Sequence, residues 1–279
     1  MNIVVTGGSG HTGKAVVKHL VQHGYTVRIV DRTPPGETLT PYTLCNLEDY
    51  GETIAALEGA DAVLHLAAIP RPTYHPHNVV FRTNVLAAYN MFEAAAVLGI
   101  QRVVYASSIS VTGYPFYERF FEPSYVPIDE EHPAAPQDSY ALSKHLGEEI
   151  AKAYVRRIGM NVISLRLPWI HTPDTFRHEV LPYRDDPQFG ASNLWLYVDT
   201  RDVSQAFRLS LETDMTGYQV YYIGARDTFM ENPSIELVNE FYPNTIILDG
   251  FGGRQSLISS CKAEQELGYQ AEYNWEMYL

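Results

Sequence analysis

The first two thirds of the chain alternates short apolar runs with longer segments of helical periodicity. The short runs are rich in β-branched residues and apolar on both faces, which is typical of strands buried in a parallel sheet. They fall at residues 3–6, 25–31, 62–66, 103–106 and 161–166. Between them, apolar residues recur at spacings of three and four, which predicts helices. These predicted helices cover residues 12–22, 47–57, 78–98 and 139–158.

This alternation predicts an α/β fold, a doubly wound parallel Rossmann sheet covered by helices on both faces. The pattern breaks after Arg166, where prolines interrupt any long element. We therefore predict a dinucleotide-binding domain over residues 1–166 and a smaller substrate-binding region over residues 167–279, interleaved with the first. We expect the sheet itself to end near Arg166.

The second region has its own, weaker periodicity. Helical patterns cover residues 203–211, 234–241 and 263–267, and strand patterns cover residues 220–223 and 245–248. We expect this region to pack over the carboxyl ends of the strands, which is where α/β proteins bind their ligands.

Charge and composition narrow the classes of function. The 279 residues carry 20 basic and 33 acidic side chains, a net charge of −13 that leaves no basic footprint for nucleic acid. No apolar stretch reaches the roughly 20 residues that cross a bilayer, and the chain opens on Asn2-Ile3 without a charged signal region. Cys45 and Cys261 are too few for a disulfide framework. We expect a reduced, cytoplasmic protein that touches neither nucleic acid nor membrane.

A glycine-rich turn joins the first predicted strand to the first predicted helix. It reads Thr6-Gly7-Gly8-Ser9-Gly10-His11-Thr12-Gly13. Gly7 permits a tight turn, Gly10 lets backbone N–H groups approach a pyrophosphate, and Gly13 lets the helix lie close to the sheet. A plain turn is the alternative, but the strand before it and the helix after it favour dinucleotide binding.

Asp31 closes the second predicted strand, downstream of the glycine turn. A carboxylate there can accept hydrogen bonds from both ribose hydroxyls and repels a 2′-phosphate, which favours NAD over NADP. Arg32 follows directly, and its guanidinium could accommodate a 2′-phosphate, so NADP stays open as the less favoured cofactor.

Further motifs continue along nearly the whole chain. They are His65-Leu66-Ala67-Ala68, Asn84-Val85, Phe92-Glu93-Ala94-Ala95, Val104-Tyr105-Ala106-Ser107-Ser108, Ser139-Tyr140-Ala141-Leu142-Ser143-Lys144, Tyr197-Val198-Asp199, Lys262-Ala263 and Leu267-Gly268-Tyr269. With the glycine turn, this set resembles the short-chain dehydrogenase/reductase superfamily. The longer pattern resembles its extended branch, the NAD-dependent epimerase/dehydratase family. The resemblance implies an enzyme that transfers hydride between a nicotinamide cofactor and a carbohydrate hydroxyl.

The candidate catalytic residues are Ser108, Tyr140 and Lys144. A phenol with a pKa near ~10 is a poor base at neutral pH. A lysine four residues later lies on the same helix face, and its charge favours the phenolate. We therefore interpret Tyr140 as the general base and acid, with Lys144 lowering its pKa. By resemblance, Lys144 also holds the nicotinamide ribose and Ser108 hydrogen-bonds the reacting oxygen. The alternative is that Tyr140 and Lys144 are merely exposed helix neighbours and Ser108 a strand cap.

The resemblance also implies a set of cofactor-binding residues. Leu66, Ala67 and Ala68 would pass along the cofactor, and Leu167 and Pro168 would touch its nicotinamide end. Asn46 stands where the family has an aspartate that binds adenine, and Asn84 matches a position that lines the cofactor and a proton relay. The full predicted set is Gly7, Ser9, Gly10, His11, Thr12, Gly13, Asp31, Arg32, Asn46, Leu47, Leu66, Ala67, Ala68, Asn84, Ala106, Tyr140, Lys144, Leu167 and Pro168.

The chain departs from this family pattern in three ways. Ile109-Ser110 follows Ser108 where dehydratases have Asp-Glu, so 4,6-dehydration lacks its acid and base. Trp195 stands where nucleotide-sugar epimerases commonly have arginine, which weakens the hold on a diphosphate. Four arginines could substitute, although each is typical of a solvated surface position: Arg177, Arg184, Arg226 and Arg254. The region after Arg166 is also short, which favours a small substrate such as a free sugar or a uronic acid.

Other candidates have ordinary interpretations. His75-Pro76-His77, His171 and His178 lack the spacing of a metal site, and we expect no metal. An insertion between Ser108 and Tyr140 is rich in aromatic residues, which would serve packing or form a substrate wall. Its aromatic residues are Phe116, Tyr117, Phe120, Phe121 and Tyr125. Trp169 is open between core packing and ligand stacking.

The sequence thus predicts an NAD-dependent oxidoreductase or epimerase acting on a sugar or nucleotide-sugar hydroxyl through Tyr140. One alternative is net oxidation of a small free sugar, as in uronate dehydrogenases. Another is a binding protein that senses NAD(P) without turnover. We expect a small-molecule carbohydrate substrate and a homodimer formed through the helices at 78–98 and 139–158.

Overall fold

The structure, a computed structural model, describes residues 1–37 and 40–279. Within them, a seven-stranded parallel sheet forms the centre of the molecule. Its strands are β1 (Asn2–Thr6), β2 (Thr26–Asp31), β3 (Tyr42–Leu44), β4 (Ala62–His65), β5 (Arg102–Ser108), β7 (Asn161–Leu167) and β10 (Tyr218–Tyr222). Their order is β10-β7-β5-β4-β1-β2-β3, and neighbouring strands pair in parallel. This confirms the predicted doubly wound fold, in which the chain order reverses between β1 and β4.

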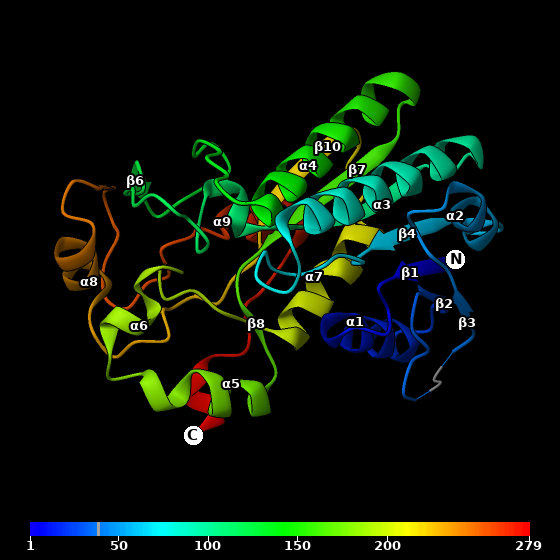
Figure 1. Cartoon of the computed structure of the whole chain (residues 1–279). Coiled ribbons are helices and arrows are strands. Elements are labelled where there is room, and N and C mark those ends of the chain that lie inside the picture. Colours follow the sequence, from blue (N-terminus) through cyan, green and yellow to red (C-terminus); the bar gives the residue numbers. More distant parts are fainter. Residues whose placement is uncertain (38–39) are drawn as a thin grey trace.

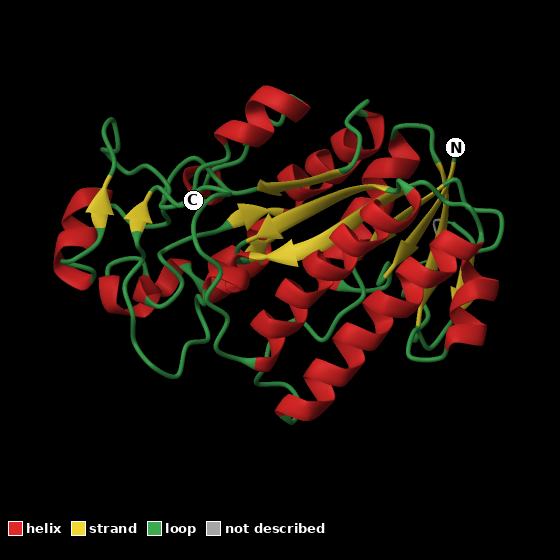
Figure 2. Cartoon of the chain, turned by 90° about the horizontal axis from the view of Figure 1, so that it is seen from above, coloured by secondary structure: helices red, strands yellow, loops and turns green. Residues whose placement is uncertain are grey.

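Helices cover both faces of this sheet (Figures 1 and 2). One face carries α1 (His11–Gln22) and α7 (Thr200–Glu212), and the other carries α2 (Tyr50–Leu57), α3 (His77–Val97) and α4 (Ser139–Ile158). The strands supply apolar side chains to both layers, since successive residues of a strand point to opposite faces. Ile3 and Val5 of β1 pack with α1 and α7, whereas Val4 packs in the cluster that contains α2, α3 and α4 side chains.

The predicted elements agree closely with the observed ones. The helix expected at 139–158 is α4, and the helix expected at 234–241 is α8 (Ser234–Phe241). The helix expected from residue 47 begins later, at Tyr50, because the Asp49 side chain accepts a 2.9 Å hydrogen bond from the N–H of Glu52 and caps it there. β3 was not expected, since it is a short edge strand in which Leu44 is exposed.

The expectation that the sheet ends near Arg166 is wrong. β10 lies parallel beside β7, with partners running from Tyr218 and Val162 to Tyr222 and Arg166. α7, which precedes β10, packs against α1. The proline-rich stretch after β7 is therefore an excursion from which the chain returns to complete the sheet. The division into two regions at residue 166 stays a prediction.

The remaining elements form a smaller region beyond the carboxyl ends of the strands, which Figure 2 shows as arrowheads pointing toward it. They are η1 (Ile109–Thr112), β6 (Tyr125–Val126), β8 (Ile170–His171), α5 (Pro173–Glu179), η2 (Leu181–Tyr183), α6 (Pro187–Ala191), β9 (Val198–Asp199), α8, β11 (Ile246–Ile247), α9 (Cys261–Leu267) and η3 (Trp275–Tyr278). β8 pairs with β9, and β6 pairs with β11. The strand expected at 245–248 is therefore β11, outside the main sheet.

A buried aromatic cluster holds this smaller region together. Trp195, Phe229, Tyr242 and Trp275 lie in one core, each at most 2% exposed. The indole N–H of Trp275 donates a 3.1 Å hydrogen bond to the Thr228 carbonyl. The last residues of the chain are thereby fastened to the centre of the region.

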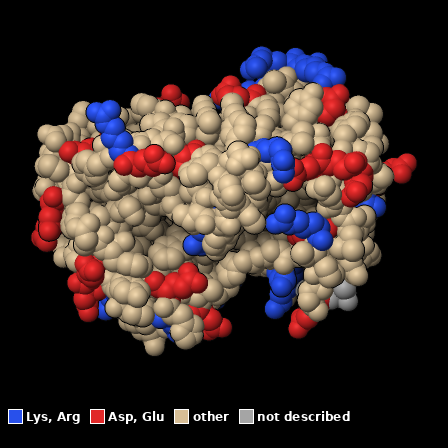
Figure 3. All heavy atoms as spheres, viewed as in Figure 1, with Lys and Arg blue, Asp and Glu red and all other residues tan. Residues whose placement is uncertain are grey.

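Acidic and basic side chains are interspersed over the face of the molecule drawn in Figure 3. The chain as a whole carries a net charge of −13. Among the helices of the described residues, none is both long enough and apolar enough to span a membrane.

Candidate active site

The turn between β1 and α1 has a shape that requires glycine. Gly7 has a φ of +73°, and a Cβ there would lie 2.6 Å from the backbone nitrogen of Ala67. A Cβ on Gly13 would lie 2.1 Å from the Gly7 carbonyl oxygen. Both distances are far below van der Waals contact. The loop after β4 and the first turn of α1 can lie this close to the Gly7 backbone only because Gly7 and Gly13 have no side chain.

The first turn of α1 presents free N–H groups. Its N-cap is Gly10, and no side chain caps the helix. The first N–H groups of a helix have no partner within the helix, and the helix dipole places partial positive charge there. His11 and Thr12 in this turn line a cavity. The arrangement fits the pyrophosphate of a dinucleotide, as the sequence predicts.

Asp31 lies at the carboxyl end of β2, beside the glycine turn. Its carboxylate accepts a 3.0 Å hydrogen bond from the Ser9 N–H and a 3.1 Å bond from the Thr33 N–H. A carboxylate has about four lone-pair sites, so acceptor capacity is left for ribose hydroxyls. The neighbouring Arg32 is exposed.

The residues that directly follow β3 lie beside Asp31. The Cys45 N–H donates a 2.9 Å hydrogen bond to the Asp31 carbonyl, which places Asn46 and Leu47 next to β2. Asn46 is exposed, and its side-chain carbonyl accepts a 3.2 Å bond from the Glu48 N–H. Leu47 is buried, and its carbonyl accepts a 2.9 Å bond from Asn90.

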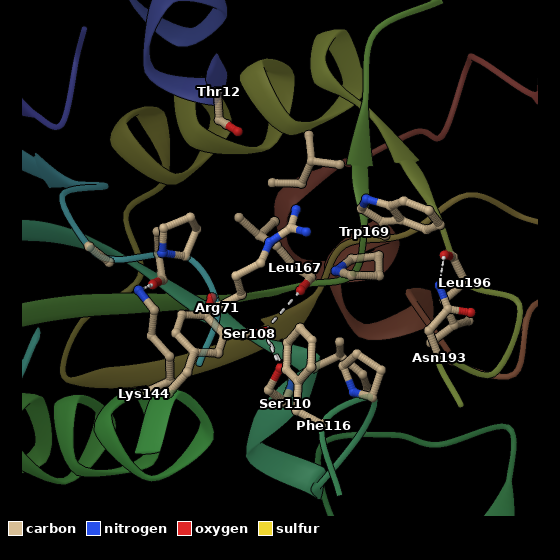
Figure 4. A pocket seen from close by; sticks show the side chains of 18 of the residues that line it. Thr12, Arg71, Ser108, Ser110, Phe116, Lys144, Leu167, Trp169, Asn193 and Leu196 are labelled. Atoms are coloured by element: carbon tan, nitrogen blue, oxygen red, sulfur yellow. Dashed lines mark hydrogen bonds between the residues drawn. The ribbon is translucent and has the colours of Figure 1, made fainter. Parts of the chain in front are cut away.

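Ser108, Tyr140 and Lys144 converge on one cavity of about 630 Å³. Figure 4 shows the side chains of Ser108 and Lys144 in it. Ser108 ends β5, and Tyr140 and Lys144 lie one turn apart in α4. Asp138 fixes the start of that helix, because its carboxylate accepts hydrogen bonds of 2.7 and 2.9 Å from the N–H groups of Tyr140 and Ala141. The two α4 side chains are buried, not the exposed helix neighbours of the alternative interpretation.

Lys144 is held firmly within this site. Its ammonium donates a 2.6 Å hydrogen bond to the carbonyl of Ala106 and lies 5.7 Å from the centre of the Tyr140 ring. Burial lowers the pKa of Lys144 to about 7. An ammonium has three donors, so two are left for hydroxyls of a bound ribose.

The pKa of Tyr140 departs from the sequence-based expectation. We expected a lowered pKa, but burial raises the pKa of Tyr140 to about 12. The Ser108 hydroxyl and the charge of Arg71 act in the opposite direction and lower it, whereas Asp138 raises it further. The pKa rises because the loss of hydration destabilises the phenolate by more than the Ser108 hydroxyl and the Arg71 charge stabilise it.

A second hydroxyl stands beside Ser108. The Ser108 Oγ donates a 3.0 Å hydrogen bond to the Ser110 Oγ and accepts a 3.1 Å bond from the Ser110 N–H. Both serines line the cavity. The sequence drew attention to Ser110 only because it replaces an acid of the dehydratases, and its polar contact with Ser108 was missed.

Aromatic side chains form part of the cavity wall. Phe116 lies edge-on to Tyr140, with ring centres 6.4 Å apart, and Trp169 and Phe189 line the same cavity. Phe116 therefore forms part of the cavity wall, whereas Tyr117 and Phe121 of the same insertion pack against the core. Trp169, left open by the sequence, faces the cavity (Figure 4).

Arg71 was not predicted, although it points into the cavity in Figure 4. It follows Ile69-Pro70 in the loop after β4, and its guanidinium stacks over the Tyr74 ring at 4.7 Å. A single arginine between two prolines matches no sequence motif. The one signal that could have suggested a role for Arg71 is its position five residues after Leu66, which was predicted to bind the cofactor. Asn193 and Ser192, which precede Trp195, were missed for the same reason.

Asn84 is not among the residues that line the cavity, and its predicted place in a proton relay stays a prediction. It is buried, and its side-chain carbonyl accepts a 2.8 Å hydrogen bond from the Ile69 N–H. Its amide donates bonds of 3.1 Å to the Ile69 carbonyl and to the Ser143 hydroxyl. Asn84 therefore ties the loop after β4 to helix α4.

The predicted cofactor residues divide into two groups. Those that line the cavity are His11, Thr12, Leu66, Ala68, Ala106, Tyr140, Lys144, Leu167 and Pro168. The others are Gly7, Ser9, Gly10, Gly13, Asp31, Arg32, Asn46, Leu47, Ala67 and Asn84. Apart from Asn84, this second group lies along or beside the carboxyl ends of β1 to β4, next to the cavity.

The arginines proposed to replace the epimerase cation lie elsewhere. Trp195 itself is fully buried, and its indole N–H donates a 2.7 Å hydrogen bond to the Pro187 carbonyl. Arg184 pairs with Glu231, and Arg254 pairs with Glu276. Of the described residues that line the cavity, none is Arg177, Arg184, Arg226 or Arg254.

Residues 3–185 match the family model described as the NAD dependent epimerase/dehydratase family. The chain belongs to this family. The membership confirms the resemblance drawn from the glycine turn and the Tyr140–Lys144 pair.

Proteins named for different activities resemble this chain. The uronate dehydrogenase of Pseudomonas putida is 29% identical over 59% of this chain, and the match spans 59% of the dehydrogenase. The UDP-glucose 4-epimerase of Corynebacterium glutamicum is 25% identical over 98% of this chain and 92% of the epimerase. A crystal structure of a short-chain dehydrogenase/reductase superfamily protein from Agrobacterium tumefaciens with bound NAD has a TM-score of 0.75 and 26% identity. It covers 100% of this chain and 95% of that one.

Proposed function

We propose that this protein is an NAD-dependent oxidoreductase that oxidises a hydroxyl of a small carbohydrate, with Tyr140 as the general base. The observation that carries the proposal is the convergence of Ser108, Tyr140 and Lys144 on a cavity that the first turn of α1 also lines. A phenol, an ammonium and a hydroxyl thus adjoin a site suited to a pyrophosphate.

The residues present fit a nicotinamide dinucleotide. The uncapped α1 turn at Gly10 would take the pyrophosphate, Asp31 the adenosine ribose and Lys144 the nicotinamide ribose. The carboxylate of Asp31 would disfavour a 2′-phosphate, which supports NAD over NADP. When bound, the dinucleotide would supply the acceptor for the hydride that leaves the carbinol carbon.

The chain's own residues handle the proton of the substrate hydroxyl. The Ser108 hydroxyl would donate a hydrogen bond to the reacting oxygen and hold it toward Tyr140. The Tyr140 phenolate would take the hydroxyl proton as the carbonyl forms. Because burial raises the pKa of Tyr140, the phenolate depends on nearby positive charge, which Arg71, Lys144 and an oxidised nicotinamide would supply.

Net oxidation of a small substrate is favoured over epimerisation of a nucleotide sugar. Trp195 is fully buried, and the four candidate arginines do not line the cavity. Arg71 is the one arginine among the described residues that line the cavity, so a second diphosphate would meet a single guanidinium there. The likeness to the P. putida uronate dehydrogenase supports the same choice. Epimerisation is the second candidate, since the C. glutamicum epimerase matches over 98% of this chain.

Turnover with NAD tests the proposal directly. The protein is incubated with NAD and a panel of aldoses, uronic acids and nucleotide sugars, and NADH absorbance is followed. We expect stoichiometric NADH with a free sugar or sugar acid. Sugar isomers without NADH would instead establish the epimerase, and no reaction in any arm despite NAD binding would favour a non-catalytic sensor.

Replacing the general base tests the mechanism. We expect Tyr140→Phe to lose turnover by at least ~100-fold while it retains NAD binding, since general base catalysis contributes about 10²–10⁴-fold. Tyr50→Phe, which alters an exposed phenol on α2, is the matched control. Equal turnover in Tyr140→Phe and Tyr50→Phe would refute the assignment of the base.

We also propose that two chains associate through α3 and α4. These helices expose Leu86, Tyr89 and Leu142, which are 36%, 48% and 39% accessible. Apolar side chains on adjacent helices suit a two-fold interface. Light scattering coupled to size exclusion should give the mass of a dimer, and Leu142→Glu should give a monomer.

A further inference from the structure

We propose that Arg71 binds an anionic oxygen substituent, a carboxylate or a phosphate, on the carbohydrate that is oxidised at Tyr140. This inference rests on the proposed function and deepens it. It states that the substrate is anionic and that one side chain, in the loop between β4 and α3, binds its negative charge.

The guanidinium of Arg71 is poised to accept an anion. Within residues 1–37 and 40–279, it makes no ion pair and no hydrogen bond, and its recorded contact is the Tyr74 ring at 4.7 Å. Arg166 and Arg184, by contrast, are paired with Glu148 and Glu231. A guanidinium offers five donors in a planar fork that matches a carboxylate or phosphate. Arg71 has the full set available.

The loop that carries Arg71 is held rigidly. Asn84 bonds both the N–H and the carbonyl of Ile69, two residues before Arg71. Pro70 and Pro72 flank the arginine, and each proline fixes its own φ and restricts the residue before it. A cation on a rigid loop loses little conformational entropy on binding, which favours its use in recognition.

The electrostatic setting makes a local cation necessary. The chain carries a net charge of −13, so an anionic substrate gains no long-range attraction. Glu179 also lines the cavity and would repel an anion, yet it forms no ion pair with Arg71. Lys144 is already bonded to the Ala106 carbonyl. Arg71 is therefore the lining side chain best placed to hold the anion.

Arg71 serves the substrate and not the dinucleotide phosphates. The free N–H groups at the start of α1 already provide a site for the pyrophosphate. The positive charge of Arg71 lowers the pKa of the Tyr140 phenol, and both side chains line the same cavity. The guanidinium is thus near the group that contacts the reacting hydroxyl, and the substituent it binds would lie on the same sugar.

Matched substrates test this assignment. The full-length protein is assayed with NAD and three sugars of one configuration: a hexose, its hexuronic acid and its 6-phosphate. We expect the wild type to prefer one of the two anionic sugars in kcat/KM, and the preferred arm identifies carboxylate or phosphate. We expect Arg71→Gln to lose on the order of 10- to 100-fold more in kcat/KM on that sugar than on the hexose, with the difference chiefly in KM. A loss in kcat that is equal on the two sugars reports the charge that Arg71 lends to Tyr140. Arg82→Gln, an exposed arginine of α3, is the control.

Binding separates this inference from the proposed function. Calorimetric titration of the preferred anionic sugar into Tyr140→Phe with NADH requires no turnover, and Arg71→Gln in the same background should abolish the heat. Binding that depends on Arg71, together with no oxidation of the same sugar by the wild type, would support the role of Arg71 and refute the proposed oxidoreductase. Preference of the wild type for the neutral hexose would overturn the role of Arg71. Weaker NAD binding in Arg71→Gln would overturn it too, by assigning Arg71 to the cofactor.

Discussion

The hydroxyl of Ser107, a residue that lines the cavity, donates a 2.6 Å hydrogen bond to the carboxylate of Glu148. The same carboxylate accepts bonds of 3.0 and 2.9 Å from the guanidinium of Arg166, and Arg166 donates a 3.2 Å bond to the Tyr222 hydroxyl. All four residues are buried. This network joins β5, α4, β7 and β10, and so fixes the helix of Tyr140 and Lys144 against the sheet.

Breaking this network should destabilise the protein strongly. We expect Glu148→Gln to cost about 3–5 kcal/mol of unfolding free energy, because Arg166 is left as an uncompensated buried charge. Glu149→Gln alters the next residue, an exposed partner of Lys152, and should cost at most ~1 kcal/mol. Urea unfolding of both variants makes the comparison. Equal losses would show that the buried pair contributes nothing beyond a surface pair.

The buried Lys144 should make stability depend on pH. Its pKa is about 7 in the folded chain and 10.5 ordinarily, so between these values the unfolded chain binds more protons. Unfolding free energy therefore rises with pH in this window, and the full cost of burying the charge is present below pH 7. Lys144→Met removes this dependence.

We expect any stability advantage of Lys144→Met over the wild type to shrink by up to about 1.4 kcal/mol per pH unit between pH 7 and 9. Urea unfolding at pH 7, 8 and 9 measures the difference, and groups that titrate in both proteins cancel. A difference that stays constant with pH would mean that Lys144 keeps its ordinary pKa when folded.

The sequence was sufficient for most of the fold because the buried strands and amphipathic helices carry strong periodicity. The helix at 139–158 agrees end to end with α4, whose Asp138 cap and Gly159 terminus mark its limits. The strand pattern at 220–223 predicted β10 (Tyr218–Tyr222), but the sequence did not place this strand beside β7, because it follows a long excursion of the chain. Which strand neighbours which in the sheet is a long-range property that local patterns do not contain.

The residues of the candidate site also divide into those that the sequence predicted and those that it missed. Ser108, Tyr140, Lys144 and the glycine turn were predictable, because their chemistry requires fixed residue types at fixed spacing. Arg71 and Asn193 reach the cavity through loops whose course depends on contacts such as that of Asn84 with Ile69. The direction of the Tyr140 pKa shift was also missed, since burial is not visible in a sequence motif.

The glycine turn offers a matched pair of substitutions. Gly7 and Gly24 both have positive φ, at +73° and +83°, but a Cβ on Gly24 would meet nothing within 4 Å. Gly24→Ala should cost only the strain of the left-handed conformation, about 1–2 kcal/mol. Gly7→Ala adds a clash with the Ala67 backbone, so we expect a larger loss in thermal unfolding and weaker NAD binding. Identical unfolding of the two variants would show that the approach of the Ala67 loop is not tight.

Asp31 should set the choice between the two nicotinamide dinucleotides. Its carboxylate is fixed by the Ser9 and Thr33 N–H groups at the end of β2, where a 2′-phosphate would meet its charge. Asp31→Asn keeps an acceptor oxygen but removes the charge, so repulsion of the phosphate falls while one ribose hydrogen bond weakens. We expect the ratio of NAD to NADP affinity to drop by on the order of tenfold, which corresponds to about 1.4 kcal/mol. Fluorescence titration of both dinucleotides measures the ratio, and Asp61→Asn, which removes an exposed carboxylate beside Asn2, should leave it unchanged. An unchanged ratio in Asp31→Asn would move the discrimination to the neighbouring Arg32, whose replacement by Gln would then have to alter it.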